Sequence, residues 1–202
     1  MGVRISYDNE QFILKDNETV LDCLLREGQS IPHSCKAGSC QSCILKMVAG
    51  EIPAIAQQGL KPSFKQQKLF LSCQCHPSTN ITVQSPNTEG LSTKASIIGK
   101  KSLNHNVLQL SLQLNDPLEY QAGQYINITN NEQVTRSFSI ANQTKKDKNI
   151  DLHIRIIPSG KMSSWLKDKA QIGDELIVRG AVGDCFYIVE ENSDYPIVLA
   201  GT

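Results

Sequence analysis

Cysteine spacing constrains this chain more than any other feature of its sequence. The chain has 202 residues and seven cysteines, and three of them, Cys35, Cys40 and Cys43, fall within the single stretch HSCKAGSCQSC. Cys73 follows much later in the chain. The N-terminus MGVRISYDNEQF lacks the apolar segment of a secretory signal. In a reducing compartment, thiols clustered in this way indicate a metal site rather than disulfides.

The pattern C-x4-C-x2-C, followed by a distant cysteine, narrows the kind of metal site. Zinc sites usually combine two short pairs of ligands, each gripping one side of a tetrahedron. Three thiolates from one loop and a fourth from a distant strand have instead the spacing of a 2Fe-2S cluster. We therefore predict that the cluster ligands are Cys35, Cys40, Cys43 and Cys73. A structural zinc ion at the same cysteines is the alternative.

Small residues surround the predicted ligands. Ala37, Gly38 and Ser39 allow the loop to wrap a cluster closely and to aim backbone N–H groups at its sulfur atoms. In an extended segment Cys75 would share a face with Cys73 and could replace it as a ligand. Because four thiolates are already supplied, we interpret Cys75 as a spare packed thiol.

Two halves meet near residues 85–94, where SPNTEGLSTK is rich in turn formers. In the first half we predict a helix over 18–27, capped by Asp16 or Asn17, and strands over 3–7, 11–15, 44–50, 68–73 and 81–85. In the second half we predict a helix over 161–170 and strands over 94–103, 106–114, 124–129, 135–141, 150–158 and 175–181. This order indicates a small α+β unit followed by a closed antiparallel barrel.

With the ligands in place, residues 1–88 resemble a plant-type ferredoxin domain, which implies a β-grasp fold. Residues 93–192 resemble the flavin-binding β-barrel of the ferredoxin reductase superfamily. The barrel resemblance implies FAD as the cofactor, with FMN left open. It also implies which residues bind the flavin.

The stretch RSFS is similar to the R-x-Y-S/T motif of that superfamily. The resemblance implies that Arg136 pairs with the pyrophosphate and that Phe138 packs against the flavin. Ser137 belongs to the same flavin-binding strand, and Ser139 is the residue expected to act at N5 of the ring. A guanidinium fork suits phosphate, and a hydroxyl can donate to a ring nitrogen. Phe138 stands where the family usually has Tyr, which removes one hydrogen bond.

A second match joins the stretches IDLHIRII and SGKMSSWL. It implies a strand beside the cofactor, followed by a G-x-x-S turn whose amides hold the pyrophosphate at the start of a helix. The strand residues are His153, Ile154 and Arg155, and the turn residues are Gly160, Lys161, Met162 and Ser163. Ser159 replaces a glycine that is common in the family.

The last part of the chain resembles the entry to a third domain. RGAVGDCFY is similar to the G-P-x-G-x-F motif, with Ala181 in place of proline. YPIVLAGT, residues 195–202, resembles the first strand of an α/β NAD(P)-binding domain. We therefore expect a chain truncated at the start of that domain, which holds FAD and the cluster but binds NAD(P)H poorly.

The resemblance implies an NAD(P)H-dependent iron-sulfur flavoprotein reductase that passes electrons through FAD and the cluster to a terminal electron acceptor protein. That acceptor is expected to be an oxygenase, a haem protein or a dehydratase that deoxygenates sugars. The different class of function left open is a zinc-stabilised binding module without redox activity.

Composition sets limits on the partners. Lys and Arg together number 20, and Asp and Glu together also number 20. This balance of charge argues against nucleic acid as a partner. No stretch approaches the roughly 18 to 20 consecutive apolar residues that would span a membrane. We therefore expect a cytoplasmic protein without a membrane partner.

Overall fold

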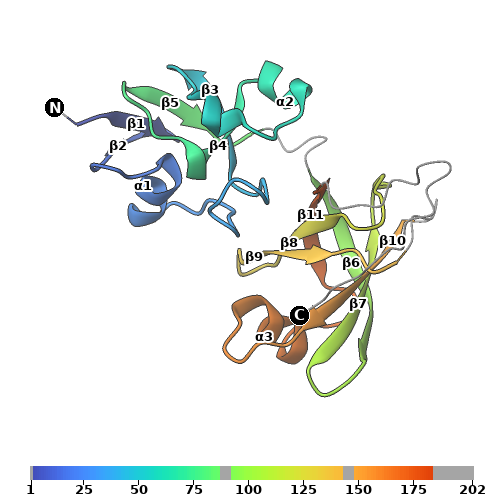
Figure 1. Ribbon diagram of the computed structural model, residues 1–202. Coiled ribbons are helices and arrows are strands. Elements are labelled where there is room, and N and C mark those ends of the chain that lie inside the picture. The colour runs from blue at the N-terminus through green and yellow to red at the C-terminus, as the bar shows by residue number, and fades with distance from the viewer. Residues whose placement is uncertain (1, 87–91, 143–147, 184–202) are drawn as a thin grey trace, which may run out of the picture.

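A computed structural model describes residues 2–86, 92–142 and 148–183, which form two lobes with one sheet each (Figure 1). The N-terminal sheet has the strand order β2-β1-β5-β3-β4, with β1 and β5 parallel and the other pairs antiparallel. The elements of this lobe are β1 (Arg4–Tyr7), β2 (Glu10–Ile13), α1 (Val20–Arg26), β3 (Ile44–Ala49), η1 (Ala54–Gln57), α2 (Pro62–Gln66), β4 (Leu69–Leu71), η2 (Ser72–Gln74) and β5 (Ile81–Gln84). The predicted α+β ferredoxin-type fold is confirmed.

The β1–β2 hairpin and α1 show how local sequence shapes this lobe. Asp8 and Asn9 form the hairpin turn with φ of 47° and 66°, a conformation that short polar side chains tolerate. Helix α1 packs its apolar stripe into the core, where Cys23 is fully buried, as predicted.

The predicted start of α1 is wrong by a few residues. Neither Asp16 nor Asn17 caps it: the cap is Thr19, whose backbone is extended and whose Oγ1 accepts a hydrogen bond from the Asp22 N–H at 3.0 Å. Asn17 lies in the preceding turn, with φ of 60°. Several polar residues in a row offer equivalent caps, and backbone geometry decides among them.

The segment between β3 and β5 differs most from the prediction. The short helices η1 and α2 were not predicted, because each buries almost nothing: Ala56 is the buried residue of η1, and α2 has none. Strand β4 ends at Leu71, earlier than predicted, and Cys73 lies in the 3-10 turn η2.

The second lobe is a six-stranded antiparallel sheet in the order β10-β7-β6-β11-β8-β9. Its elements are β6 (Ser92–Ser102), β7 (Val107–Leu114), β8 (Tyr125–Thr129), β9 (Thr135–Ser139), β10 (Asn149–Arg155), α3 (Lys161–Asp168) and β11 (Glu175–Val182). The sheet curls into a barrel around a core that includes Leu110, Ile126 and Trp165. Each predicted strand of this half is present, within a few residues of its predicted ends.

The barrel is not closed, so the predicted closure is wrong. Strands β9 and β10 end the sheet on opposite sides, and among the described residues they are joined by the single bridge between Ile140 and Leu152. β10 pairs with β7 along its whole length, whereas β9 has five residues and reaches β10 only past its end. A row of strands in a sequence does not reveal how far the first and last strands pair.

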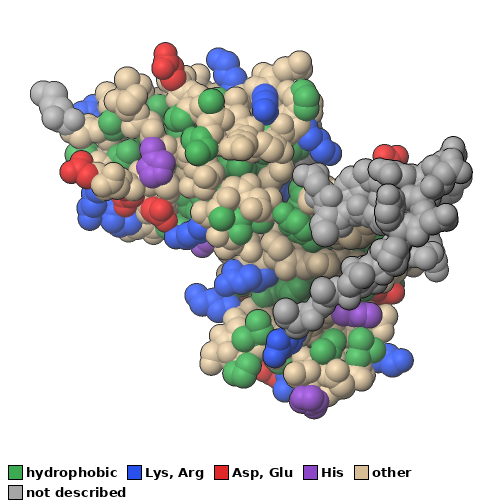
Figure 2. All heavy atoms as spheres, viewed as in Figure 1, with side chains coloured by type: hydrophobic (Ala, Val, Ile, Leu, Met, Phe, Trp, Pro, Cys, Tyr) green, Lys and Arg blue, Asp and Glu red, His purple; other side chains and the backbone are tan. Residues whose placement is uncertain are grey.

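Some predictions fall outside the described residues. They include the strand at 195–202, most of the RGAVGDCFY motif and residues 87–91 of the expected connection. None of the helices in the described ranges is long and apolar enough to cross a membrane. On the face shown in Figure 2, basic and acidic side chains are spread over both lobes.

The cap of α1 generates a stability prediction. We expect Thr19→Ala to lower the free energy of unfolding by about 1 kcal/mol, because the Asp22 N–H loses its acceptor. Asp16→Ala is the matched control and should change that free energy by less than about 0.5 kcal/mol. Urea unfolding followed by circular dichroism measures both. A larger loss in the Asp16 variant would contradict the assignment of the cap.

Candidate cluster and flavin site

The four predicted cluster ligands form two pairs of thiols in the N-terminal lobe. In the first pair, the Cys40 N–H donates to Cys35 Sγ at 3.3 Å, and the Cys35 N–H donates to Cys40 Sγ at 3.4 Å. In the second pair, the thiols of Cys43 and Cys73 are hydrogen-bonded to each other. Cys35 is exposed, and the other three are buried.

Hydrogen bonds lower the pKa of two of these thiols, Cys35 and Cys73. Burial opposes the ionisation of Cys35, but hydrogen bonds from the backbone N–H groups of Ala37 and Cys40 outweigh it and lower the pKa of that thiol. The hydrogen bond from Cys43 lowers the pKa of Cys73 to about 6, against the effect of burial. The same bond raises the pKa of Cys43. The predicted aim of backbone N–H groups at the sulfurs is therefore present.

The paired arrangement suits a dinuclear cluster. A 2Fe-2S cluster needs two thiolates on each iron, which the pairs Cys35–Cys40 and Cys43–Cys73 can supply.

Cys75 lies in the core rather than at the cluster site. It is fully buried, and burial alone raises the pKa of its thiol to about 12. Its carbonyl accepts from the Val20 N–H at 2.9 Å, which ties η2 to the start of α1. The buried position agrees with the interpretation of Cys75 as a packed thiol.

The RSFS stretch forms most of β9. This strand faces the loop of residues 35–43, here called the cluster loop, across the boundary between the lobes. Arg136 is exposed, and its Nη1 donates to the carbonyl of Thr135 at 2.6 Å. Ser139 is also exposed, while Phe138 is partly buried against the barrel core. Ser137 donates to Asn127 Oδ1 at 2.7 Å, so its hydroxyl is engaged within the protein.

The structure separates the other predicted flavin residues. His153 and Arg155 are exposed on β10, but the Ile154 side chain is fully buried in the core. A contact between Ile154 and a cofactor would therefore have to come from its backbone. Alternation along the strand explains the difference, because successive side chains point to opposite faces.

The G-x-x-S turn opens α3, as predicted. A Cβ at Gly160 would lie 2.5 Å from Ser163 Oγ and 3.0 Å from the Ile157 carbonyl, so only glycine fits. Ser163 is buried and accepts from the Ile157 N–H at 3.2 Å, and Met162 packs in the core. Ser159 has φ of 60°, which explains why glycine suits this position in the family.

The start of α3 offers hydrogen-bond donors at the predicted pyrophosphate position. The first N–H groups of a helix have no partner within it, and Gly160 provides no side-chain cap. The exposed Lys161 adds positive charge at the first residue of α3, and the cavity that it lines also contains Glu132, Asp168 and Lys169. Backbone amides, Lys161 and Arg136 are the donors that a pyrophosphate requires.

A cavity of about 310 Å³ joins the two sites. It is lined by two cluster cysteines and by residues of the predicted flavin strand: Cys35, Ser39, Cys40, Tyr125, Ser137, Phe138 and Ser139. Residues that are far apart in the sequence therefore share one space.

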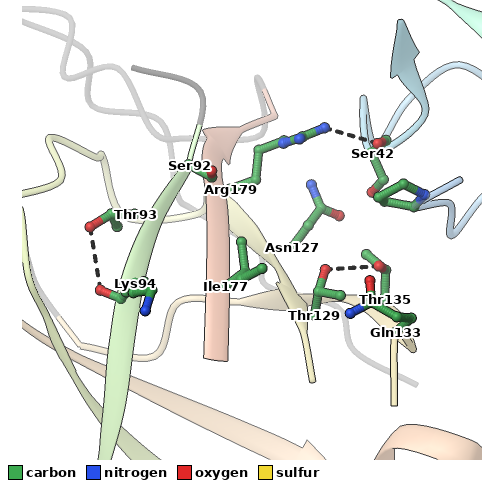
Figure 3. Close-up of a pocket in the computed structure, with 11 residues that line it drawn as sticks. Ser42, Ser92, Thr93, Lys94, Asn127, Thr129, Gln133, Thr135, Ile177 and Arg179 are labelled. Carbon is green, nitrogen blue, oxygen red and sulfur yellow. Dashed lines mark hydrogen bonds between the residues drawn. The ribbon is translucent and has the colours of Figure 1, made fainter. Parts of the chain in front are cut away.

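Three residues that sequence reasoning missed hold the lobes together. Tyr125 Oη donates to the Ser39 carbonyl at 2.8 Å, and Asn127 Nδ2 donates to the Cys40 carbonyl at 2.7 Å. Arg179 Nη1 donates to the Ser42 carbonyl at 2.9 Å (Figure 3). A weak signal existed, because Asn127 and Arg179 interrupt apolar strands, but polar strand residues usually face water.

The two thiols of η2 generate a prediction about the cluster. We expect Cys73→Ala to lose the visible absorbance of a 2Fe-2S cluster, because one iron would lack a ligand. Cys75→Ala removes a buried thiol two residues away and should keep the iron content unchanged, with only a loss of stability. Iron and sulfide analysis of both purified variants measures this. Full cluster content in the Cys73 variant would contradict the ligand assignment.

Two glycines with the same backbone conformation test the cluster loop. Gly38 and Gly28 have φ of 82° and 83°, but a Cβ at Gly38 would lie 3.1 Å from Gln74 Cγ, and one at Gly28 would meet nothing within 4 Å. Gln74 Nε2 donates to Cys73 Sγ at 3.7 Å. Both Ala variants should lose about 1 kcal/mol of stability.

Only Gly38→Ala should also speed the loss of cluster absorbance, by about tenfold, because it displaces a group that supports a ligand. The measurement is the half-life of the visible absorbance in the presence of a chelator. Equal half-lives in the two variants would show that the contact with Gln74 is unimportant.

Known protein families match both lobes. Residues 4–78 match the 2Fe-2S iron-sulfur cluster binding domain, and residues 94–187 match the oxidoreductase FAD-binding domain. The chain is 28% identical over 200 residues to the xylene/toluene monooxygenase electron transfer component XylA of Pseudomonas putida, covering 95% of this chain and 57% of that protein. It is 34% identical over 208 residues to protein RfbI of Salmonella typhimurium, covering 98% and 60%.

Among solved structures, the Amycolatopsis cytochrome P450 reductase GcoB is similar, with a TM-score of 0.51 and 26% identity over 92% of this chain and 59% of that one. The chain thus spans less than two thirds of the length of these relatives. The matched domains and their order agree with the thiol pairs and the flavin strand described above. The chain therefore combines a 2Fe-2S iron-sulfur cluster binding domain, over residues 4–78, with an oxidoreductase FAD-binding domain, over residues 94–187, and is similar in this order to fused reductase components.

Proposed function

We propose that the chain forms the flavin and iron-sulfur part of an electron-transfer oxidoreductase. Electrons from NADH or NADPH would reach FAD on the barrel, pass to the 2Fe-2S cluster and leave for an acceptor protein. The observation that carries the proposal is the shared cavity lined by Cys35 and Cys40 on one side and by Phe138 and Ser139 on the other. Such a cavity suits two redox groups in close proximity.

The residues of the chain have distinct tasks in this proposal. Cys35, Cys40, Cys43 and Cys73 hold the cluster. Arg136 and the amides at Gly160 to Ser163 bind the pyrophosphate, which anchors FAD on the barrel. Phe138 and Ser139 orient the flavin ring toward the cluster loop. A bound flavin supplies the exchange between hydride transfer and single-electron transfer.

The proposed acceptor is an oxygenase component. The support is the printed name of a relative, which is the electron transfer component of a monooxygenase. Exposure of Cys35 and of the neighbouring loop residues Lys36 and Ala37 leaves part of the cluster rim open to a partner. We also propose a cytoplasmic location and functional units at residues 1–88 and 93–192, with 195–202 as the start of a nicotinamide-binding domain.

Anaerobic redox titration tests the proposed function. The chain reconstituted with iron, sulfide and FAD should be brown-yellow, and dithionite should bleach both the flavin and the cluster absorbance. Oxidised cytochrome c, an artificial one-electron acceptor, should then restore them. Arg136→Gln should weaken FAD binding by about tenfold or more, because a charge-assisted hydrogen bond is lost, yet keep the cluster. Lys167→Gln, on the exposed side of α3, is the control and should bind FAD normally.

Two results would contradict the proposal. A colourless protein that binds stoichiometric zinc would favour the metal-stabilised binding module. Full FAD binding by the Arg136 variant would show that the assignment of β9 to the flavin site is wrong.

A further inference from the structure

Arg179 on β11 is a cation of the barrel that contacts the cluster loop directly. Its guanidinium crosses the boundary between the lobes and donates to the Ser42 carbonyl at 2.9 Å (Figure 3). Arg179 lines one cavity of about 310 Å³ together with Ser42 and Asn127. It also lines a second cavity, of about 70 Å³, together with the cluster ligand Cys40. The guanidinium therefore packs against the segment from Cys40 to Ser42.

The charge of Arg179 has no carboxylate partner among the described residues. The ion pairs found there involve Arg26, Lys36, Lys94 and Lys169. Moving a cation out of water costs several kcal/mol unless an opposite charge compensates it. The acidic groups nearest to this guanidinium in the structure are the ligand cysteines: Cys40 lines the same small cavity, and the Ser42 carbonyl that Arg179 binds directly precedes Cys43. A negatively charged cluster at these cysteines would therefore supply the compensating charge.

We propose that Arg179 is a positioning residue that raises the reduction potential of the cluster while the two lobes are docked. The inference rests on the proposed function, since it requires a 2Fe-2S cluster at the four cysteines. A cluster held by four thiolates carries net negative charge, which increases on reduction. A fixed cation beside it stabilises the reduced form more than the oxidised form, and the low dielectric of a buried boundary strengthens the effect.

Arg179 belongs to the barrel lobe, whereas the cysteines belong to the N-terminal lobe, so its effect on the cluster potential depends on the contact between the lobes. Docking brings the cation to the cysteines and favours electron transfer from the flavin to the cluster. Tyr125 and Asn127 hold the docked arrangement through carbonyls of the same loop.

Potentiometric titration of the chain loaded with cluster and FAD tests the inference, with the electron paramagnetic resonance signal of the reduced cluster as the readout. Arg179→Gln should lower the midpoint potential of the cluster by at least about 59 mV, a tenfold change in a one-electron equilibrium. Arg179→Lys keeps the charge and should restore most of the wild-type potential. Lys101→Gln removes an exposed lysine near the far end of β6 and should leave the potential unchanged.

A second variant tests the inference even if the Arg179→Gln protein does not fold. Asn127 lines the same cavities as Arg179, so Asn127→Asp places a carboxylate beside an intact arginine and should also lower the potential. An unchanged potential in both variants, with full cluster content, would overturn the inference. Equal losses in Arg179→Gln and Arg179→Lys would overturn it as well, because they would indicate a packing role. Absence of the cluster signal from the wild-type chain would instead contradict the proposed function.

Discussion

The contact between Cys43 and Ser72 is the point on which the cluster site depends. β3 pairs with β4 so that Ile44 lies opposite Leu71, and the Cys43 carbonyl then accepts from both the N–H and the Oγ of Ser72, at 3.1 and 2.8 Å. These bonds bring Cys73 to Cys43. Without this register the fourth thiol would lie elsewhere, and a loop with three thiols would not complete a dinuclear site.

The cluster loop uses its backbone in two directions. Its N–H groups point inward to the sulfurs of Cys35 and Cys40, where they offset negative charge. Carbonyls of residues 39, 40 and 42 point outward and accept hydrogen bonds from the barrel. The polarity of the peptide group therefore serves the cluster and the docking of the lobes at once. Donors on the barrel are required for this arrangement, and a tyrosine, an asparagine and an arginine supply them.

Local chemistry explains which features could be predicted. The cysteine spacing, the Asp8–Asn9 turn and the glycine at the start of α3 each follow from a short stretch and from one physical requirement. The errors arise where distant residues decide. Thr19 rather than Asp16 caps α1 because of the path of the preceding turn, and the barrel stays open because β9 meets β10 only near Ile140. Ile154 has a cofactor-flanking position in the motif, yet alternation places its side chain in the core.

By itself, the sequence determined the four candidate ligands, the order of an α+β unit before a β-barrel, and the family motifs of the candidate flavin strand and turn. These features depend on residue types at short or fixed spacing. Only the tertiary structure decided that the thiols form two pairs and that Arg179 and Asn127 meet the cluster loop. Hydrogen bonds between two lobes depend on how the sheets are placed in space, and such placement leaves no periodic pattern in the chain.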